Sequence, residues 1–382
     1  MTLRYLTAGE SHGKALVGIL EGLPAGLALS AADIQADLLR RKKGHGRGNR
    51  QKIEGDQVEI LSGIRAGKTL GSPLGLLIPN QDFKNWEGIM GHEPTDKPST
   101  KRVDVPRPGH ADLVGKIKYG FDDMRNVLER ASARETAMRV ALGGAARKLL
   151  LDLNIHVASR VVAIGGETDD SAVPCPVAEL NALTDADPVR CANPNFSKRM
   201  VARIDQAKAA GDTVGGLFEV LADGLPVGLG SYAQWDRRLE GPLSAALMSL
   251  NAIKGVEVGF GFRGAGLPGS QAHDAYEPKG KKVGYRSNRS GGLDGGMTTG
   301  QTLVLRAAMK PIATLMEPLD SVDLRTMKPA KAHVERSDAC AVPAAAVIAE
   351  SLACLVLANA VLEKFGGDSM RELVPRIEAW RR

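Results

Sequence analysis

Aromatic residues are scarce in this chain, at 4% of 382 residues. Proteins that bind single-stranded nucleic acid stack bases on aromatic side chains, so this composition argues against such a surface. No apolar run of about 18 residues is evident, which predicts that no segment spans a membrane. The N-terminal residues, MTLRYLTAGESHG, contain no long apolar stretch either, so we expect no secretory signal.

Cysteine is also rare, and its spacing excludes a common class of site. Cys175, Cys191, Cys340 and Cys354 are far apart, and no two of them have CxxC spacing. This spacing argues against a zinc ribbon, and we expect no metal site. Widely spaced cysteines are most simply the free thiols of a cytoplasmic protein.

What the chain has in excess is glycine and positive charge. It contains 44 glycines, and 50 Lys and Arg against 44 Asp and Glu give a net charge of +6. Such an excess suits nucleic acid, a membrane surface or an anionic small molecule, and the distribution of the charge must decide between them. The length allows one to three domains with a large core.

Apolar runs and alternations alternate with long helical patterns, which favours an α+β fold over a doubly wound sheet. The expected strands are Leu3–Thr7, Val58–Leu61, Gly75–Ile78, His156–Ile164, Gly216–Ala222, Val256–Phe260 and Gln301–Arg306. The expected helices are Ser30–Lys42, Asn126–Asp152, Asn195–Ala210, Pro242–Ile253 and Pro343–Phe365. Neither GxGxxG nor GxxxxGK[ST] occurs in the glycine-rich segment after residue 284, so ordinary dinucleotide and P-loop sites lack support.

Residues 107–139 combine a histidine with many cations. His110 lies in PGHAD, and Arg125, Arg130, Arg134 and Arg139 follow it. This combination suits an anionic ligand that needs both charge neutralisation and proton transfer. The helix expected after residue 126 would place Arg130 and Arg134 on one face, and its alanines and glycines would let another element approach closely.

Two segments of the N-terminal region also suggest a site. His12 in AGESHG is either a general acid or an ordinary loop histidine. The run RRKKGHGRGNR, residues 40–50, is either a solvated basic loop, a nucleic-acid patch or an anion site, in which backbone N–H groups between the cations also contribute.

Two further segments lie in the C-terminal third. SNRSGGLDGGMTTG, from residue 287, has glycines that permit close backbone approach to a phosphate-bearing cofactor, although a flexible surface loop has the same composition. Asp338 in RSD precedes an expected helix, and it is either a base or a partner in an ion pair.

Taken together, these segments resemble those of the chorismate synthase family. AGESHG, RPGHAD with KYG and SARETA, SNRSGG with GGMTTG, RAAMKPIAT, and RSD before CAVP occur in the family's order along nearly the whole chain. The insertion-like segment DFKNWEGIMGHEPTDKPSTKR resembles the longer bacterial form. One departure is RSD, where many members have RHD; it leaves Arg336 and Asp338 in place.

The resemblance implies a carbon–oxygen lyase that converts 5-enolpyruvylshikimate 3-phosphate to chorismate by 1,4-elimination of phosphate and a ring hydrogen. The family requires reduced FMN, although the reaction has no net redox change. The ring C–H bond is a poor match for a simple base, and a reduced flavin lends electron density while the protein supplies position, protons and field.

The resemblance also implies residue roles. His12 would donate a proton near the leaving phosphate, His110 would serve the flavin ring, and Asp338 would help flavin N5 accept the ring proton. The implied substrate contacts are Arg40, Arg47, Arg107 and Arg134. The implied flavin contacts are Arg130, Ala131, Ser132, Asn251, Ala252, Gly296, Lys310, Pro311, Ile312, Ala313, Thr314 and Arg336. Arg41 and Arg47 match the family's positions for a nicotinamide nucleotide, NADP.

The implied fold is a β-α-β sandwich of antiparallel sheets and helical layers, with residues 1–382 forming one domain of a cytoplasmic homotetramer. Two other classes compete with the lyase. An NADPH-dependent flavin oxidoreductase would share the FMN site but would consume NADPH stoichiometrically. An RNA-binding protein would explain the charge, but the scarcity of aromatics and the absence of an RRM-type motif count against it, so we expect no nucleic-acid partner.

Overall fold

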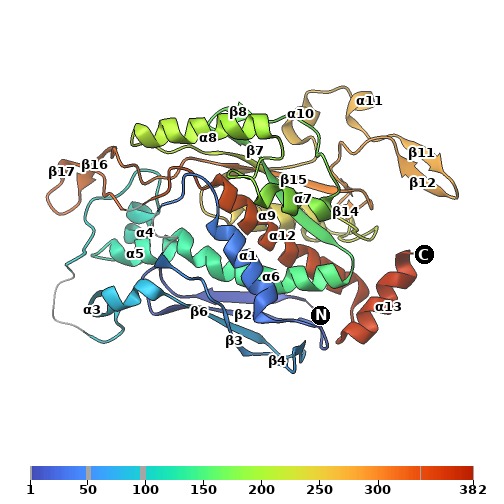
Figure 1. Ribbon diagram of the computed structural model, residues 1–382, viewed down its shortest axis with the longest axis horizontal. Coiled ribbons are helices and arrows are strands. Elements are labelled where there is room, and N and C mark those ends of the chain that lie inside the picture. The colour runs from blue at the N-terminus through green and yellow to red at the C-terminus, as the bar shows by residue number, and fades with distance from the viewer. Residues whose placement is uncertain (1, 49–52, 95–99, 336, 382) are drawn as a thin grey trace.

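A four-stranded antiparallel sheet covers one side of the molecule (Figure 1). The computed structural model describes residues 2–48, 53–94, 100–335 and 337–381. The strand order is β1 (Arg4–Ala8), β2 (Ala15–Glu21), β6 (Leu74–Pro79) and β3 (Glu59–Ser62). In β2, Leu16 and Leu20 are buried, whereas Val17 and Ile19 are exposed. This alternation means that only one face of the sheet packs on the core.

A second antiparallel sheet lies on the other side of the central helices (Figure 1). Its order is β10 (Ile253–Val258), β15 (Leu303–Met309), β9 (Gly216–Asp223), β7 (His156–Ile164) and β8 (Glu167–Thr168). Strand β7 is buried along nearly its whole length because helices pack against it from both faces. The apolar run VVAI in this strand is typical of such double coverage.

Three helices fill the space between the two sheets. They are α1 (Ala31–Lys42), α6 (Thr136–Asp152) and α12 (Val342–Phe365). Helix α6 packs on β2 and β6, whereas α12 packs on β7 and β9 and against α6. A Cβ atom added at Gly143 of α6 would meet the Cβ of Ser351 at 2.4 Å, so the small residue permits this close approach. The expected α+β class and β-α-β sandwich are confirmed.

Helix α12 bears on the expectation that no segment spans a membrane. By length and composition it is apolar enough to cross a membrane over an 18-residue stretch, its most apolar window. However, 89% of that window is buried inside the protein, and the helix lies between α6 and the second sheet. It is therefore a core helix, and its apolar length reflects burial on all sides.

The remaining elements surround this framework. The other helices are α3 (Glu87–Met90), α4 (Asp112–Tyr119), α5 (Arg125–Ala131), α7 (Val177–Asp185), α8 (Pro194–Ala209), α9 (Glu240–Met248), α10 (Gly261–Ala265), α11 (Gly269–Ala272), α13 (Met370–Arg381), η1 (Gln81–Asn85), η2 (Ala133–Glu135) and η3 (Trp235–Arg237). The two-stranded ribbons pair β4 (Ile64–Arg65) with β5 (Lys68–Thr69), β11 (Tyr276–Lys279) with β12 (Lys282–Tyr285), β13 (Leu293–Asp294) with β14 (Met297–Thr298), and β16 (Asp320–Asp323) with β17 (Lys328–Lys331).

Most expected elements are present, with two corrections to the helices. The helix expected at Asn126–Asp152 is interrupted, because Ser132 has extended backbone angles and separates α5 from η2 and α6. The helix expected at Pro242–Ile253 ends at Met248, and Ala252 adopts a left-handed φ of 67° just before β10 begins. All four cysteines are free thiols, as expected.

Candidate active site

A cavity of about 540 Å³ opens where the ends of several elements meet. Its walls come from the loop after β1, the C-terminal end of α1, the α5–α6 junction, the turn after α9, the end of β15 and the start of α12. The described charged residues in this lining are Arg41, Arg47, Arg107, Arg134, Lys254, Lys310, Glu54, Glu335 and Asp338. Because the cations outnumber the carboxylates, the cavity suits an anionic ligand.

The interruption between α5 and α6 sends two neighbouring arginines in different directions. The Ser132 hydroxyl accepts a hydrogen bond from the backbone N–H of Arg134, which stabilises the turn. Arg134 is buried and lines the cavity. Arg130 instead donates to the carbonyl oxygens of Thr7 and Gly9, and it is not part of the described lining. The expectation that both arginines share one helix face was therefore wrong.

Arg41 and Arg134 share a buried carboxylate, that of Asp56. Arg41 Nη1 lies 3.2 Å from Asp56 Oδ2, and Arg134 Nη1 donates to Asp56 Oδ1. Arg134 also lies 3.4 Å from Glu54, whose second oxygen is buried without a partner in the described structure. Burial lowers the pKa of Arg41 to about 10, so this side chain remains cationic at neutral pH.

Arg47 and Asp338 form a second pair across the cavity wall. Arg47 Nη1 donates to Asp338 Oδ2 at 2.6 Å, and the backbone N–H of Gly48 donates to Oδ1 at 2.6 Å. The Arg47 Nε atom is buried and has no hydrogen-bond partner in the described structure. The structure thus brings the basic loop after α1 to the carboxylate before α12, whereas Arg336 lies outside the described residues.

His110 and Arg107 are bound to the same buried carboxylate. His110 Nδ1 lies 2.6 Å from Asp112 Oδ1, and Arg107 Nε donates to Oδ2 at 2.8 Å. Burial by itself would raise the pKa of Asp112, but the hydrogen bonds from His110 and Arg107 hold it well below its usual range. Arg107 Nη1 also donates to Thr314 Oγ1 at 2.9 Å, which connects this trio to the residues after β15.

His12 has an equivalent arrangement on another wall. Its ring Nδ1 lies 3.0 Å from both carboxylate oxygens of Glu129, and its backbone N–H donates to Glu129 Oε2 at 2.8 Å. The imidazole stacks on the indole of Trp86, with ring centroids 3.8 Å apart. Both candidate histidines therefore have Nδ1 against a buried carboxylate.

The remaining wall is formed largely by neutral groups and backbone. Asn251 Nδ2 donates to the Ala131 carbonyl at 3.0 Å, while Asn251 Oδ1 is buried without a partner in the described part of the chain. Lys310 Nζ donates to the Gly109 carbonyl at 2.6 Å. A buried acceptor without a donor beside a cavity is a feature that a ligand N–H can satisfy.

Most residues predicted for the site line this cavity. They are His12, Arg41, Arg47, Arg107, His110, Ala131, Ser132, Arg134, Asn251, Ala252, Lys310, Ile312, Ala313, Thr314 and Asp338. Four predicted residues do not belong to the described lining, namely Arg40, Arg130, Gly296 and Pro311. Gly296 packs closely against Arg238 and Ser231. It has a φ of 90°, which glycine adopts readily, in the turn between β13 and β14.

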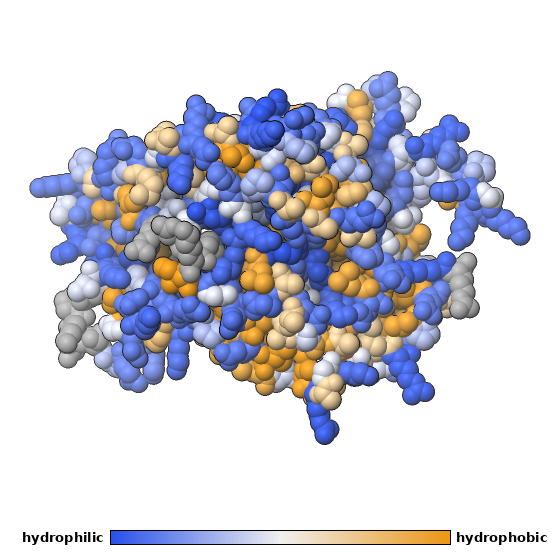
Figure 2. Space-filling view, in the orientation of Figure 1, coloured by the Kyte–Doolittle hydropathy of each residue, from blue (hydrophilic) through white to orange (hydrophobic). Residues whose placement is uncertain are grey.

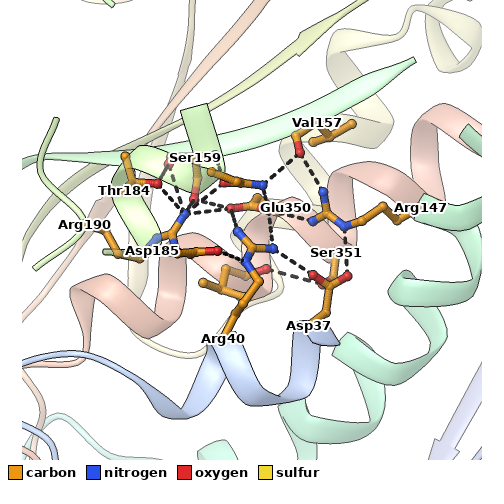
Figure 3. Close-up of polar contacts among 12 residues, drawn as sticks. Asp37, Arg40, Arg147, Val157, Ser159, Thr184, Asp185, Arg190, Glu350 and Ser351 are labelled. Atoms are coloured by element: carbon orange, nitrogen blue, oxygen red, sulfur yellow. Dashed lines mark hydrogen bonds and ion pairs between the residues drawn. The ribbon is translucent and has the colours of Figure 1, made fainter. Parts of the chain in front are cut away.

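Arg40 is absent from the described lining, and its side chain enters a buried ionic cluster, which we call the Glu350 cluster (Figure 3). This cluster comprises Asp37, Arg40, Arg147, Asp185, Arg190 and Glu350. Arg40 donates to Glu350 Oε1 at 2.8 Å and to Asp185 Oδ2 at 2.6 Å. Glu350 is fully buried, and the charges of Arg40, Arg147 and Arg190 hold its pKa far below normal although burial opposes this shift.

Sequence reasoning missed the carboxylates that hold the site residues. Asp112 follows His110 within PGHAD, so its position beside the histidine was a usable signal. Glu54, Asp56, Glu129 and Trp86 carry no comparable local signal, because each reaches its partner only through the tertiary fold.

Comparison with known proteins agrees with this geometry. The family model described as chorismate synthase matches residues 3–362. The chain is 56% identical to a chorismate synthase of Moorella thermoacetica and 53% identical to one of Thermobifida fusca, each over 99% of this chain and 98% of the relative. It is 52% identical to chorismate synthase 1 of Bacillus cereus over 98% of both chains.

A solved structure described as a crystal structure of chorismate synthase superposes with a TM-score of 0.79 at 41% identity, covering 100% of this chain and 97% of that one. These comparisons thus place the chain in a class of carbon–oxygen lyases. The chain belongs to the chorismate synthase family, whose members act in aromatic amino-acid biosynthesis.

Proposed function

We propose that this protein converts 5-enolpyruvylshikimate 3-phosphate to chorismate by 1,4-elimination of phosphate and a ring hydrogen. The observation that carries this proposal is the convergence of His12 and His110, each held by a carboxylate, with buried arginines around one cavity. The substrate bears a phosphate and two carboxylates, so it needs both anion binding and proton transfer.

The substrate anions would be bound by Arg47, Arg107 and Arg134, and we add Arg41 to this group because it shares Asp56 with Arg134. Each of these guanidinium groups already contacts a carboxylate, which orients it before the substrate arrives. Arg40 does not enter this proposal, because its donors are directed to Asp37, Asp185 and Glu350.

Three residues would move protons. His12 would donate from Nε2 to the leaving phosphate, since its Nδ1 is directed at Glu129. His110 would serve the flavin ring from the opposite nitrogen to the one that contacts Asp112. Asp338 would assist transfer of the ring proton towards flavin N5, and its contact with Arg47 orients the carboxylate.

The residues present fit reduced FMN, which would lend electron density to the substrate as phosphate leaves and then recover it. Among the residues that the structure describes, no donor reaches the buried Asn251 Oδ1, and the imide N–H of an isoalloxazine ring would supply one. The residues that would hold the flavin are Ala131, Ser132, Asn251, Ala252, Lys310, Ile312, Ala313 and Thr314, with Arg130, Gly296, Pro311 and Arg336 carried over from the family alone.

An anaerobic assay tests the reaction. Chemically reduced FMN and the enolpyruvyl substrate are supplied, and phosphate and chorismate are measured together. We expect equal amounts of both products and no net oxidation of the flavin. Oxidised FMN with NADPH forms the comparison arm, because Arg41 and Arg47, the family's nicotinamide positions, lie in the same cavity. Stoichiometric consumption of NADPH would favour the oxidoreductase and count against the lyase.

We also propose that the protein is a cytoplasmic homotetramer built from one domain per chain. The outer face of the first sheet exposes apolar residues, among them Leu6 at 72% and Ile19 at 47%, which are cross-strand partners. Figure 2 shows apolar side chains gathered over this sheet. A contiguous apolar face of this kind supports self-association. The main hydrophobic cluster includes residues of both sheets and supports a single domain.

Light scattering tests the assembly. Ile19→Glu places a charge on the exposed sheet face and should reduce the molar mass below that of a tetramer, whereas Glu21→Gln in the same strand should leave it unchanged. A wild-type mass equal to one chain would contradict the proposed assembly.

A further inference from the structure

Glu129 holds residue 12 through more contacts than ion pairing requires. Its carboxylate accepts from the His12 backbone N–H at 2.8 Å, and both of its oxygens lie 3.0 Å from His12 Nδ1. Its backbone carbonyl accepts from the N–H of Ser11 at 2.9 Å. Because Glu129 is 1% exposed, water does not compete for these bonds. The C-terminal part of α5 therefore fixes both the loop and one ring nitrogen.

Trp86 fixes the remaining freedom of the imidazole, which is rotation of its plane. The two rings are stacked, with an interplanar angle of 19° and centroids 3.8 Å apart. Trp86 is itself buried between η1 and α3, and its Nε1 donates to Asp82 Oδ2 at 3.2 Å. It lies in the segment DFKNWEGIMGHEPTDKPSTKR, whose presence resembles the longer bacterial form.

The second ring nitrogen of His12, Nε2, is the one available to a ligand. His12 Nε2 has no hydrogen-bond partner among the residues that the structure describes. His12 lines both the main cavity and a neighbouring cavity of about 460 Å³, whose walls also include Trp86, Lys101 and Arg125. The histidine thus forms part of the partition between the two cavities.

We propose that Glu129 and Trp86 are positioning residues that fix the tautomer and the plane of His12, so that only Nε2 exchanges a proton with the leaving phosphate. This inference rests on the proposed role of His12. In the step itself, the C–O bond breaks with its electron pair remaining on phosphate, and the Nε2 proton passes to a phosphate oxygen. The ring becomes neutral and retains its Nδ1 proton. The Glu129 carboxylate accepts a hydrogen bond from this Nδ1–H both before and after the transfer.

Nitrogen-15 NMR of histidine-labelled protein tests the tautomer without any turnover. The His12 signals are identified by their loss in His12→Asn. In the wild-type protein at a pH where the ring is neutral, we expect Nδ1 to carry the proton. A wild-type ring that carries its proton on Nε2 would overturn the proposal, whether or not the enzyme is active.

Glu129→Gln provides the second arm. The glutamine oxygen can still accept from the His12 backbone N–H, but its amide NH₂ then faces Nδ1 and favours a proton on Nε2 instead. We expect the tautomer to change and kcat to fall by roughly tenfold to a thousandfold, with KM within about twofold. Glu135→Gln is the matched control, because Glu135 is a buried glutamate that pairs with Arg139 and does not line the cavity.

The indole is tested in the same way. Trp86→Leu should reduce kcat while the proton remains on Nδ1, and Trp86→Phe, which retains a stacking ring, should recover most of the activity. Trp380→Phe, at an exposed tryptophan, controls for loss of an indole. If Glu129→Gln retains the wild-type tautomer and kcat, the positioning role is refuted. If the wild-type protein shows the expected tautomer but forms no chorismate, the proposed function fails instead.

Discussion

Two groups of arginines and carboxylates meet at adjacent residues of α1. Arg40 enters the Glu350 cluster, whereas Arg41 lines the cavity. In the Glu350 cluster, Arg40, Arg147 and Arg190 are matched by Asp37, Asp185 and Glu350 (Figure 3). In the cavity, the cations of the described lining exceed the carboxylates. The same residue types thus form a closed, neutral cluster on one side of the helix and an open, positive one on the other.

This difference separates groups that maintain the fold from groups available to a ligand. Within the described part of the chain, the buried side-chain atoms without a hydrogen-bond partner include three at the cavity, namely Arg47 Nε, Glu54 Oε1 and Asn251 Oδ1, and one in the Glu350 cluster, Arg190 Nε. Natural proteins leave few such atoms, because each one costs about 1–3 kcal/mol. Arg47, Glu54 and Asn251 line the cavity, so a ligand that binds there can satisfy their free atoms.

The largest expected effect is on turnover, and it should be confined to the cavity. His110→Ala and Asp338→Ala each remove a proposed proton-transfer group, so kcat should fall by about 10²–10⁴-fold. The melting temperature should change little, because neither residue belongs to the hydrophobic core. Anaerobic phosphate release and calorimetry on the same samples measure the two quantities. Wild-type turnover in both variants would remove these residues from the mechanism.

The Glu350 cluster should show the opposite behaviour. Glu350→Gln leaves three buried arginines with two carboxylates, and losing one partner of a buried ionic group costs about 3–5 kcal/mol. Urea unfolding measures this loss. Glu363→Gln, on the same helix but in an exposed pair with Arg237, should cost no more than about 1 kcal/mol. Equal losses in the two variants would show that burial does not distinguish these pairs.

The pH dependence of stability sharpens the contrast further. The pKa of Glu350 is lower in the folded protein than its ordinary value of 4.5. Its ionised form therefore stabilises the fold above pH 4.5, and this contribution is lost as the pH falls from there towards the folded pKa. Unfolding free energy measured between pH 6 and pH 3 should decline less steeply in Glu350→Gln than in the wild type. Parallel curves would contradict this linkage.

The smallest expected effect is a loss of stability at the start of α1, the helix that carries both Arg40 of the Glu350 cluster and Arg41 of the cavity. Ser30 caps α1 through a capping box with Asp33. Ser30→Ala should destabilise the protein by about 1 kcal/mol without changing kcat, because the helix still carries both arginines. Ser30→Thr retains the hydroxyl and should recover most of this loss. A selective loss of turnover would show that the cap acts on the cavity alone.

Much of the fold is encoded locally and was predictable. Strand β7 and helix α1 have strong hydrophobic patterns and clear ends. The capping box of α1 is visible in the sequence, because Asp33 follows Ser30 by three positions. The break at Ser132 was not predictable from propensity, because residues 126–152 are rich in helix formers. It is stabilised by tertiary contacts, such as the hydrogen bond from Ser11 Oγ to Ser132 Oγ.

The same distinction holds for the site. His12, His110 and Asp338 stand out in unusual motifs, and the structure places all three around one cavity. Arg40 and Arg41 cannot be distinguished by sequence, since both belong to one basic run and only the direction of each side chain separates them. The contact between His12 and the Glu129 carboxylate joins residues 117 positions apart, so a local pattern does not record it, whereas Asp112 lies two positions from His110.

The burial of α12 has a consequence for the order in which the chain acquires its structure during synthesis. Residues 342–365 leave the ribosome after both sheets and α6 have been translated, yet α6, β7 and β9 all pack on this helix. Until then, the apolar faces of those elements lack their cover. We therefore expect stable folding only once residues 342–365 have left the ribosome, with nascent chains that depend on chaperones until then to keep those faces from aggregating.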